Sequence, residues 1–138
     1  MLLEIGIISQ LARAHIDGLL PDGISNPHFA VLSHLVRLGG AHAPLTLARA
    51  FQVPKPTMTN TLAGLEKRGL IEMAPNPEDG RSKLVSLTAA GAAVHAQAIA
   101  DLGPDLKRLD DAIGADQIAA ILPHLADIRR HLDAARDE

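Results

Sequence analysis

The segment at residues 54–88 constrains the fold of this 138-residue chain more than any other. It begins with a short polar stretch and continues through two apolar runs, at residues 70–73 and 84–87. The residues between the runs, 75–83, are charged and include two prolines and a glycine, which favour turns and keep strand edges open. The order of these signals predicts a polar helix followed at once by a β-hairpin with a basic tip.

Composition restricts the core to aliphatic side chains. The chain is 47% hydrophobic but only 1% aromatic, with Phe29 and Phe51 as its only Phe, Tyr or Trp residues. Its length is that of one domain with a small core, which must consist of Leu, Ile, Val and Ala at helix interfaces. The chain has no cysteine, which excludes disulfides, a thiol nucleophile and a thiol-based redox switch.

The first twenty residues do not have the pattern of a signal peptide. No basic segment precedes the apolar residues, and Glu4, Gln10 and Arg13 interrupt them. No run approaches the roughly 20 apolar residues of a membrane span. We therefore expect a cytoplasmic protein that has no membrane partner.

Apolar periodicity and helix-stop residues predict six helices. Pro104 and Pro123 should bend the last two, because each proline removes a backbone hydrogen bond and crowds the preceding turn. Thr88 is expected to cap the fifth helix. The helices are expected at residues 2–20, from Asn26-Pro27 to Gly39-Gly40, at 44–51, from a start between Pro54 and Thr57 to Arg68-Gly69, from Thr88 to Gly114, and from about Asp116 to Arg136.

The third and fourth helices are joined by a tight turn and form a helix-turn-helix unit. A helix followed by a basic hairpin can reach two grooves of double-stranded DNA, because the helix enters the major groove and the hairpin lies along the minor groove. Residues 37–83 hold seven basic and four acidic side chains, whereas residues 84–138 hold five basic and nine acidic ones, and the whole chain has a net charge of −3. Charge alone does not separate a DNA-binding surface from a mixed solvated one.

The terminal helices carry more apolar surface than a small winged domain needs. In the fifth helix, Leu102, Leu106, Leu109 and Ile113 are spaced by 4, 3 and 4 residues, which resembles a coiled-coil seam. The sixth helix has a stripe at residues 118, 122, 125, 128 and 132. A second copy of the chain is the simplest partner for this surface, so we expect a homodimer. The alternative is that the first, fifth and sixth helices only pack on one another.

Three motifs carry a resemblance to a known family. They are T-M-T-N-T-L-x-x-L-E-K-R-G-L-I at residues 57–71, N-P-E-D-G-R-S-K at 76–83, and L-V-S-L-T-x-x-G at 84–91. Over nearly its whole length the chain resembles the MarR family of winged helix-turn-helix transcriptional regulators, in which a D-x-R tip and an L-T-x-x-G helix start recur at this spacing. Two departures stand out: Asn60 replaces an Arg of many members, and Pro54 replaces a helix-capping Ser.

The resemblance implies a mainly α fold with a small β-hairpin wing. The expected organisation is a single subunit, 1–138, with a winged helix-turn-helix DNA-binding region at 27–91 and helical dimerisation regions at 1–20 and 92–138. It also implies that some members lose DNA affinity when a small aromatic or anionic effector binds between the dimer helices and the winged domain. Polar groups near that junction include His15, His34 and Arg37.

The recognition helix and the wing supply the expected DNA contacts. Short hydroxyl and amide side chains on the first turns of the helix can reach base edges, and Asn60 can bond adenine. Met58 either packs inward or touches a thymine methyl group. Arg81 is expected in the minor groove, with Asp79 as the intramolecular partner that orients it or the wing. The predicted contacts are Lys55, Thr57, Met58, Thr59, Asn60 and Thr61 from the helix, and Arg81, Ser82 and Lys83 from the wing. The alternative is that these threonines and tip charges are ordinary solvated residues.

No pattern in the chain points to catalysis. Its seven histidines lack the i, i+4 spacing of two ligands on one helix turn, so we expect no cofactor and no metal. The predicted function is a sequence-specific DNA-binding regulator, most simply a repressor, acting as a homodimer on a pseudo-palindromic site. Two other functions stay open: a helical dimeric protein-interaction module that has lost DNA binding, and an enzyme with a metal site built from histidines.

Overall fold

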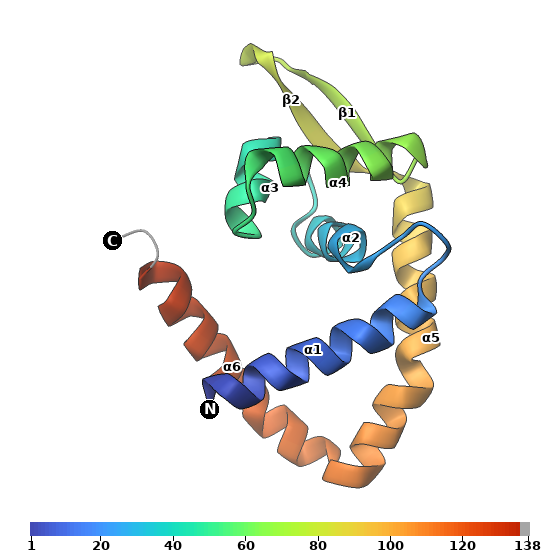
Figure 1. Ribbon diagram of the computed structural model, residues 1–138, viewed down its shortest axis with the longest axis vertical. Helices are drawn as coiled ribbons and strands as arrows, with labels where there is room; N and C mark the ends of the chain where they lie inside the picture. Colours follow the sequence, from blue (N-terminus) through green and yellow to red (C-terminus); the bar gives the residue numbers. More distant parts are fainter. Residues whose placement is uncertain (136–138) are drawn as a thin grey trace. The chain divides into compact units, whose positions relative to one another are not determined.

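Six helices and one hairpin make up the computed structural model, which describes residues 1–135 (Figure 1). By backbone contacts the chain divides into two compact units, one at Met1–Asp101 and one that begins at Leu102. The mainly α architecture with a two-stranded wing confirms the prediction. The elements are α1 (Leu2–Leu19), α2 (Asn26–Leu38), α3 (Pro44–Ala50), α4 (Lys55–Lys67), β1 (Ile71–Asn76), β2 (Asp79–Leu87), α5 (Ala89–Ile113) and α6 (Ala115–Ala135).

The helix boundaries follow the expected stop and start residues. Helix α4 begins directly after Pro54, and α2 ends at Gly39, whose φ of 63° suits a residue without a Cβ. Ser25 and His28 form a reciprocal cap at the start of α2. The expected end of the last helix at Arg136 lies outside the described residues.

The core of the first unit is aliphatic, as the composition predicts. Leu32, Leu47 and Leu65, from α2, α3 and α4, each have 0% of their surface exposed. Ile71 of β1 and Val85 of β2 close the cluster from the base of the hairpin. Figure 1 shows the hairpin extending from these three helices, with its tip beyond α4. The core therefore fixes the base of the hairpin, whereas the tip lies outside the core.

The hairpin differs from the prediction in its loop. We expected short strands and an open loop at residues 75–83, but the strands reach Asn76 and Asp79 and leave two residues between them. Pro75 pairs with Lys83, and the register shifts directly after Pro75. Proline is tolerated here because the two-stranded sheet has free edges, so its missing N–H need not break a ladder.

A third segment joins the base of the hairpin. His42, in the connection between α2 and α3, forms an isolated antiparallel bridge with Val85. The two residues exchange backbone hydrogen bonds of 2.9 Å, from the His42 N–H to the Val85 oxygen, and 2.8 Å in the reverse direction. The wing is thus tied to the helix-turn-helix at a second place.

The start of α5 is held tightly against the hairpin. The Thr88 Oγ1 accepts a 3.0 Å bond from the Gly91 N–H and donates a 2.7 Å bond to the Gly69 oxygen. A Cβ on Gly91 would lie 2.0 Å from the Leu70 oxygen, so only glycine fits. This contact explains the glycine of the L-T-x-x-G motif, and the hydrogen bond confirms Thr88 as the cap.

The first and last helices have no buried core of their own among the described residues. Neither α1 nor α6 contains a buried residue, and Leu122 of α6 is 59% exposed. Helix α5 continues through Pro104, where Gly103 has no Cβ to clash with the proline ring. The expected bends at Pro104 and Pro123 stay predictions. Within residues 1–135, no helix is long and apolar enough to cross a membrane.

Candidate nucleic-acid interface

The exposed start of α4 carries most of the predicted contact residues. Lys55, Thr59 and Asn60 are exposed on it. The N–H groups of Lys55 and Thr57 lie in the first turn and therefore lack an intrahelical acceptor. No side chain caps them, and Pro56 between them has no N–H. Free N–H groups and the positive end of the helix dipole favour a phosphate at this position.

The hydroxyls of two threonines of α4 are oriented by the helix itself. Thr59 donates to the Lys55 oxygen at 3.0 Å, and Thr61 donates to the Thr57 oxygen at 3.1 Å. Because each hydroxyl hydrogen is used in this way, the threonine oxygens are left as hydrogen-bond acceptors. In the major groove, acceptors pair with the amino groups of adenine and cytosine.

Met58 does not belong to the contact set. Its side chain is 3% exposed and packs in the core with Leu62 and Leu65. Of the two positions that the sequence allowed, the structure has the inward one. The prediction of a DNA contact by Met58 is therefore wrong, because a buried side chain cannot touch a base.

Arg81 projects from the irregular part of the wing. Gly80, Arg81 and Ser82 face no residue of β1 in the strand register, since Pro75 faces Lys83 and the next residue, Asn76, faces Asp79. Arg81 is exposed, and the structure of residues 1–135 gives its guanidinium no protein partner. Asp79 contacts its backbone instead, because the Asp79 Oδ1 accepts a 3.0 Å bond from the Arg81 N–H.

Ser82 and Lys83 differ in their availability. The Ser82 hydroxyl is half-buried; it donates to the Asp79 oxygen and accepts from the Asn76 Nδ2, both at 3.2 Å. The hydroxyl that we expected to contact DNA is thus engaged inside the tip. Lys83 is exposed. The sequence reasoning missed Asn76, although an Asn before Pro in a turn is a residue whose side chain commonly bonds nearby backbone.

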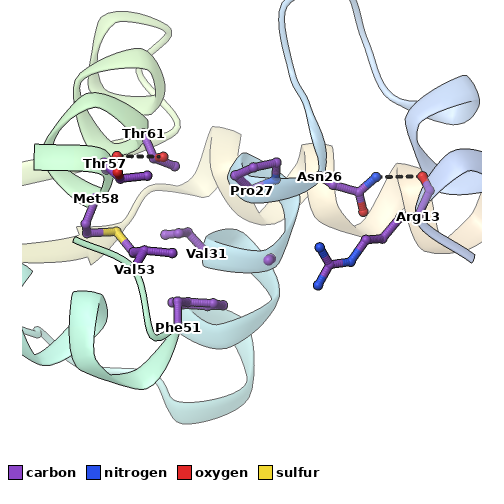
Figure 2. A pocket seen from close by; sticks show the side chains of 10 residues that line it. Arg13, Asn26, Pro27, Val31, Phe51, Val53, Thr57, Met58 and Thr61 are labelled. Atoms are coloured by element: carbon purple, nitrogen blue, oxygen red, sulfur yellow. Dashed lines mark hydrogen bonds between the residues drawn. The ribbon is translucent and has the colours of Figure 1, made fainter. Parts of the chain in front are cut away.

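A pocket of about 240 Å³ lies behind the start of α4 (Figure 2). Thr57 and Thr61 line it from α4, and the guanidinium of Arg13 extends toward it from α1. Asn26, the first residue of α2, joins α2 to α1, because its N–H donates to the Asp17 Oδ1 at 2.8 Å and its Nδ2 to the Arg13 oxygen at 2.6 Å. The remaining lining is mostly apolar: Pro27, Ala30, Val31, Phe51, Val53 and Met58.

Of the polar groups expected near the effector junction, none lines this pocket. His34 lies instead beside His42 and Phe51, with ring centroids 6.1 and 5.3 Å away. Burial, then the nearby charges of Arg37 and His42, lower the pKa of His34 below its ordinary value. Among residues 1–135, no group of three or more His, Cys, Asp or Glu side chains could hold a metal ion.

His28 connects the start of α2 with the recognition helix. Its Nδ1 accepts a 3.1 Å bond from the Ser25 N–H, and a Cβ on Gly64 of α4 would lie 2.8 Å from its Nε2. Burial is the main cause that lowers the pKa of His28, and the charge of Arg68 adds to it. The guanidinium of Arg68, which is exposed, lies over Gly23 in the α1–α2 connection.

Comparison with known proteins gives a consistent result. The model of the MarR family matches residues 22–82. The multiple antibiotic resistance protein MarR of Salmonella typhimurium is 36% identical over 104 residues, which cover 75% of this chain and 72% of that protein. The corresponding protein of Escherichia coli is 34% identical over the same length and coverage.

Solved structures agree in fold. Wild-type MarR from E. coli, without ligand, superimposes with a TM-score of 0.75 at 30% identity, covering 90% of this chain and 92% of that one. A cysteine-to-serine mutant of the same protein in complex with operator DNA gives a TM-score of 0.67 at 28% identity, covering 92% and 94%. These likenesses extend over the helix-turn-helix, the wing and the terminal helices. The chain therefore belongs to the MarR family of DNA-binding transcriptional regulators.

Proposed function

We propose that this protein is a transcriptional repressor that binds a pseudo-palindromic operator as a homodimer. The observation that carries the proposal is that one compact unit holds two features: an uncapped polar helix start, and near the hairpin tip an exposed Arg81 whose guanidinium has no protein partner within residues 1–135. A regulator must meet the chromosome, so we place it in the cytoplasm.

The DNA-binding region is residues 27–91 in this proposal. Lys55, Thr57, Thr59, Asn60 and Thr61 face the major groove, with the threonine oxygens accepting from base amino groups. Arg81 enters the minor groove, where negative potential is strong, and Lys83 neutralises a phosphate. A MarR protein of E. coli has been crystallised with its operator DNA, which supports this mode of binding.

The dimerisation regions are residues 1–20 and 92–138. Support comes from the exposed apolar side chains of the terminal helices, among them Leu11, Leu109 and Leu122, each at least 46% exposed. Such a surface is larger than a solitary soluble subunit normally presents, and a twofold partner would cover it. In a dimer of this kind the two recognition helices should lie about 34 Å apart, one turn of B-DNA.

The effector is proposed to bind in the pocket behind α4. A guanidinium at one side and an apolar wall suit a small aromatic anion, because the cation pairs with the carboxylate while the ring is removed from water. Thr57 and Thr61 line the pocket and also belong to the proposed DNA contact set. A ligand there would compete with DNA for these threonines, or would displace the start of the recognition helix.

The test of DNA binding begins with selection of bound sequences from a random duplex pool. We expect enrichment of an inverted repeat and a steep loss of affinity with salt. Arg81→Ala should weaken binding to the selected site at least about tenfold and reduce the salt slope by about one. Arg108→Ala is the control, since it removes the same charge from α5, and it should bind as the wild type does. Overlaid curves for wild type and Arg81→Ala would disprove the wing contact, and flat enrichment would disprove the function.

The test of the effector uses benzoate as the probe. We expect benzoate to release the selected DNA from the wild-type protein. Arg13→Gln should bind DNA as the wild type does but should no longer respond to benzoate, whereas Arg13→Lys should keep part of the response. Release of both variants at the wild-type benzoate concentration would show that this pocket is not the effector site.

A further inference from the structure

The wing tip contains two polar side chains that are less exposed than their neighbours. Asn76 and Ser82 are half-buried, while Glu78, Asp79 and Arg81 around them are exposed. Polar groups that leave water need a hydrogen-bond partner. At this tip they find it in each other, and not in the body of the protein.

Four hydrogen bonds join these residues into one connected network. The Asn76 side chain acts in both directions, because its Oδ1 accepts from the Glu78 N–H at 3.0 Å and its Nδ2 donates to the Ser82 Oγ at 3.2 Å. The Ser82 hydroxyl then donates to the Asp79 oxygen at 3.2 Å. Asp79 completes the series, since its Oδ1 accepts from the Arg81 N–H at 3.0 Å.

This network replaces the strand ladder where the ladder is missing. Between the pairs Asn76–Asp79 and Pro75–Lys83, residues 80–82 of β2 face no residue of β1 in the strand register. Pro75 has no N–H to offer them. The backbone that carries Arg81 is therefore held by side chains on both sides of it, with Asp79 before it and Ser82 after it.

We propose that Asn76 and Ser82 are positioning residues for the minor-groove contact of Arg81. The inference rests on the proposed DNA-binding function. Neither residue touches DNA in this assignment; they hold residues 80–82 in the looped conformation from which the guanidinium projects. Without them the tip would sample many conformations. The contact of Arg81 with DNA would then have to offset the conformational entropy that the tip loses on binding.

A direct role for Ser82 gives a different experimental signature. A hydroxyl that bonds phosphate would contribute whether or not Arg81 is present. A hydroxyl that only positions Arg81 would contribute nothing once the guanidinium is removed. A double-mutant cycle separates the two roles, because it measures whether the effects of two substitutions are independent.

The experiment measures affinity for the selected duplex with Asn76→Ala, Ser82→Ala and Arg81→Ala, singly and in pairs. We expect Asn76→Ala and Ser82→Ala each to weaken binding about fivefold, the effect of one hydrogen bond. In the Arg81→Ala background neither substitution should weaken binding further. Ser82→Thr keeps the hydroxyl and should bind within about twofold of the wild type. Ser86→Ala is the matched control, since it removes a hydroxyl from the same strand away from the tip.

A second measurement does not need DNA. Amide hydrogen exchange by NMR should show faster exchange of the Arg81 N–H in Ser82→Ala and Asn76→Ala than in the wild type, with the exchange of Val85 unchanged. Faster exchange at Val85 as well would indicate that the whole hairpin had opened; the proposal then fails, because the network would serve the fold and not the tip.

The remaining outcomes are distinct from failure of the proposed function. If the wild type binds DNA and Arg81→Ala weakens binding, but Asn76→Ala and Ser82→Ala do not, only the positioning role is wrong. If their effects persist in full without Arg81, they act on DNA directly and the inference is overturned. If the wild type binds no duplex, the DNA-binding function itself fails.

Discussion

The winged region and the terminal helices use apolar side chains in opposite ways. Leu32, Leu47 and Leu65 of the winged region are fully buried. Helix α6 also carries a regular stripe of apolar residues, but it contains no buried residue. Burial within the chain stabilises the first region by itself, at roughly 25 cal/mol per Å² of apolar surface. The second region leaves its apolar side chains exposed, and we propose that a second subunit covers them. The four predictions below test this difference.

The largest effect should follow from a charge in the stripe of α6. Leu125→Asp places a carboxylate in the proposed interface twice, once per subunit, and burying an unpaired charge costs several kcal/mol. We expect the dissociation constant of the dimer, measured by sedimentation equilibrium, to rise at least about a thousandfold above that of the wild type. Ala120→Glu, on the far side of α6 from Leu122, is the control and should leave the dimer intact. Equal particle masses for the wild type and Leu125→Asp would refute the interface.

The next effect concerns the core of the winged region. Leu65→Ala leaves a cavity among fully buried side chains and should lower the free energy of unfolding by about 3 kcal/mol. Leu45→Ala, at a position 47% exposed, should change it by less than about 0.5 kcal/mol. Denaturant titration at fixed protein concentration checks both. Equal losses for the two variants would mean that the core is not where the structure has it.

Replacing one glycine in each region should change the free energy of unfolding in opposite directions. Gly91→Ala drives a methyl group against the Leu70 oxygen and should cost about 2–3 kcal/mol, as for an overpacked core. Gly6→Ala in α1 has no atom within 4 Å of the new Cβ and should gain about 0.5–1 kcal/mol from helix propensity. Thermal unfolding followed by circular dichroism distinguishes them. A stable Gly91→Ala protein would contradict the close contact between α5 and the hairpin.

The smallest effect is a dependence on pH that arises in the winged region. The pKa values of His28 and His34 are lowered from the ordinary 6.5, so the folded state binds fewer protons than the unfolded state. Stability is therefore full above 6.5 and is lost as the pH falls through 6.5 toward the folded-state values. We expect Tm to fall by only about 1–3 °C between roughly pH 7.5 and 5.5.

The corresponding variants locate the effect. His28→Gln with His34→Gln should flatten the pH dependence of Tm. His124→Gln with His131→Gln removes the same number of histidines from α6 and should leave the curve unchanged. If the α6 variant flattened the curve instead, the acid sensitivity would lie outside the winged region.

Local signals made most of the fold predictable. Helix limits at Gly39, Pro54 and Thr88 follow from the conformations that glycine, proline and a capping hydroxyl prefer, and these depend only on neighbouring residues. The bridge between His42 and Val85 was not predictable in this way, because it joins segments far apart in the sequence. The reach of the strands to Asn76 and Asp79 was missed because Pro75 indicated a loop.

The candidate site shows the same division. Residue type pointed to Arg81 and the polar start of α4, since few other positions combine basic or hydroxyl side chains with a turn. It could not decide the orientation of Met58, because a helix of this composition has a narrow apolar face. Nor could it assign Ser82 to the interior of the tip, since that depends on a partner, Asn76, on the opposite strand.

The bridge at His42 has a mechanical consequence for how this protein would read an operator. Because the base of β2 is bonded both to β1 and to the α2–α3 connection, we expect the wing to keep its position relative to the helix-turn-helix. If α4 and Arg81 read DNA as we propose, each subunit holds its two points of contact with DNA at a fixed distance from each other. One base pair inserted between its two points of contact would abolish recognition of that half-site, while the spacing between half-sites would be set by the dimer alone.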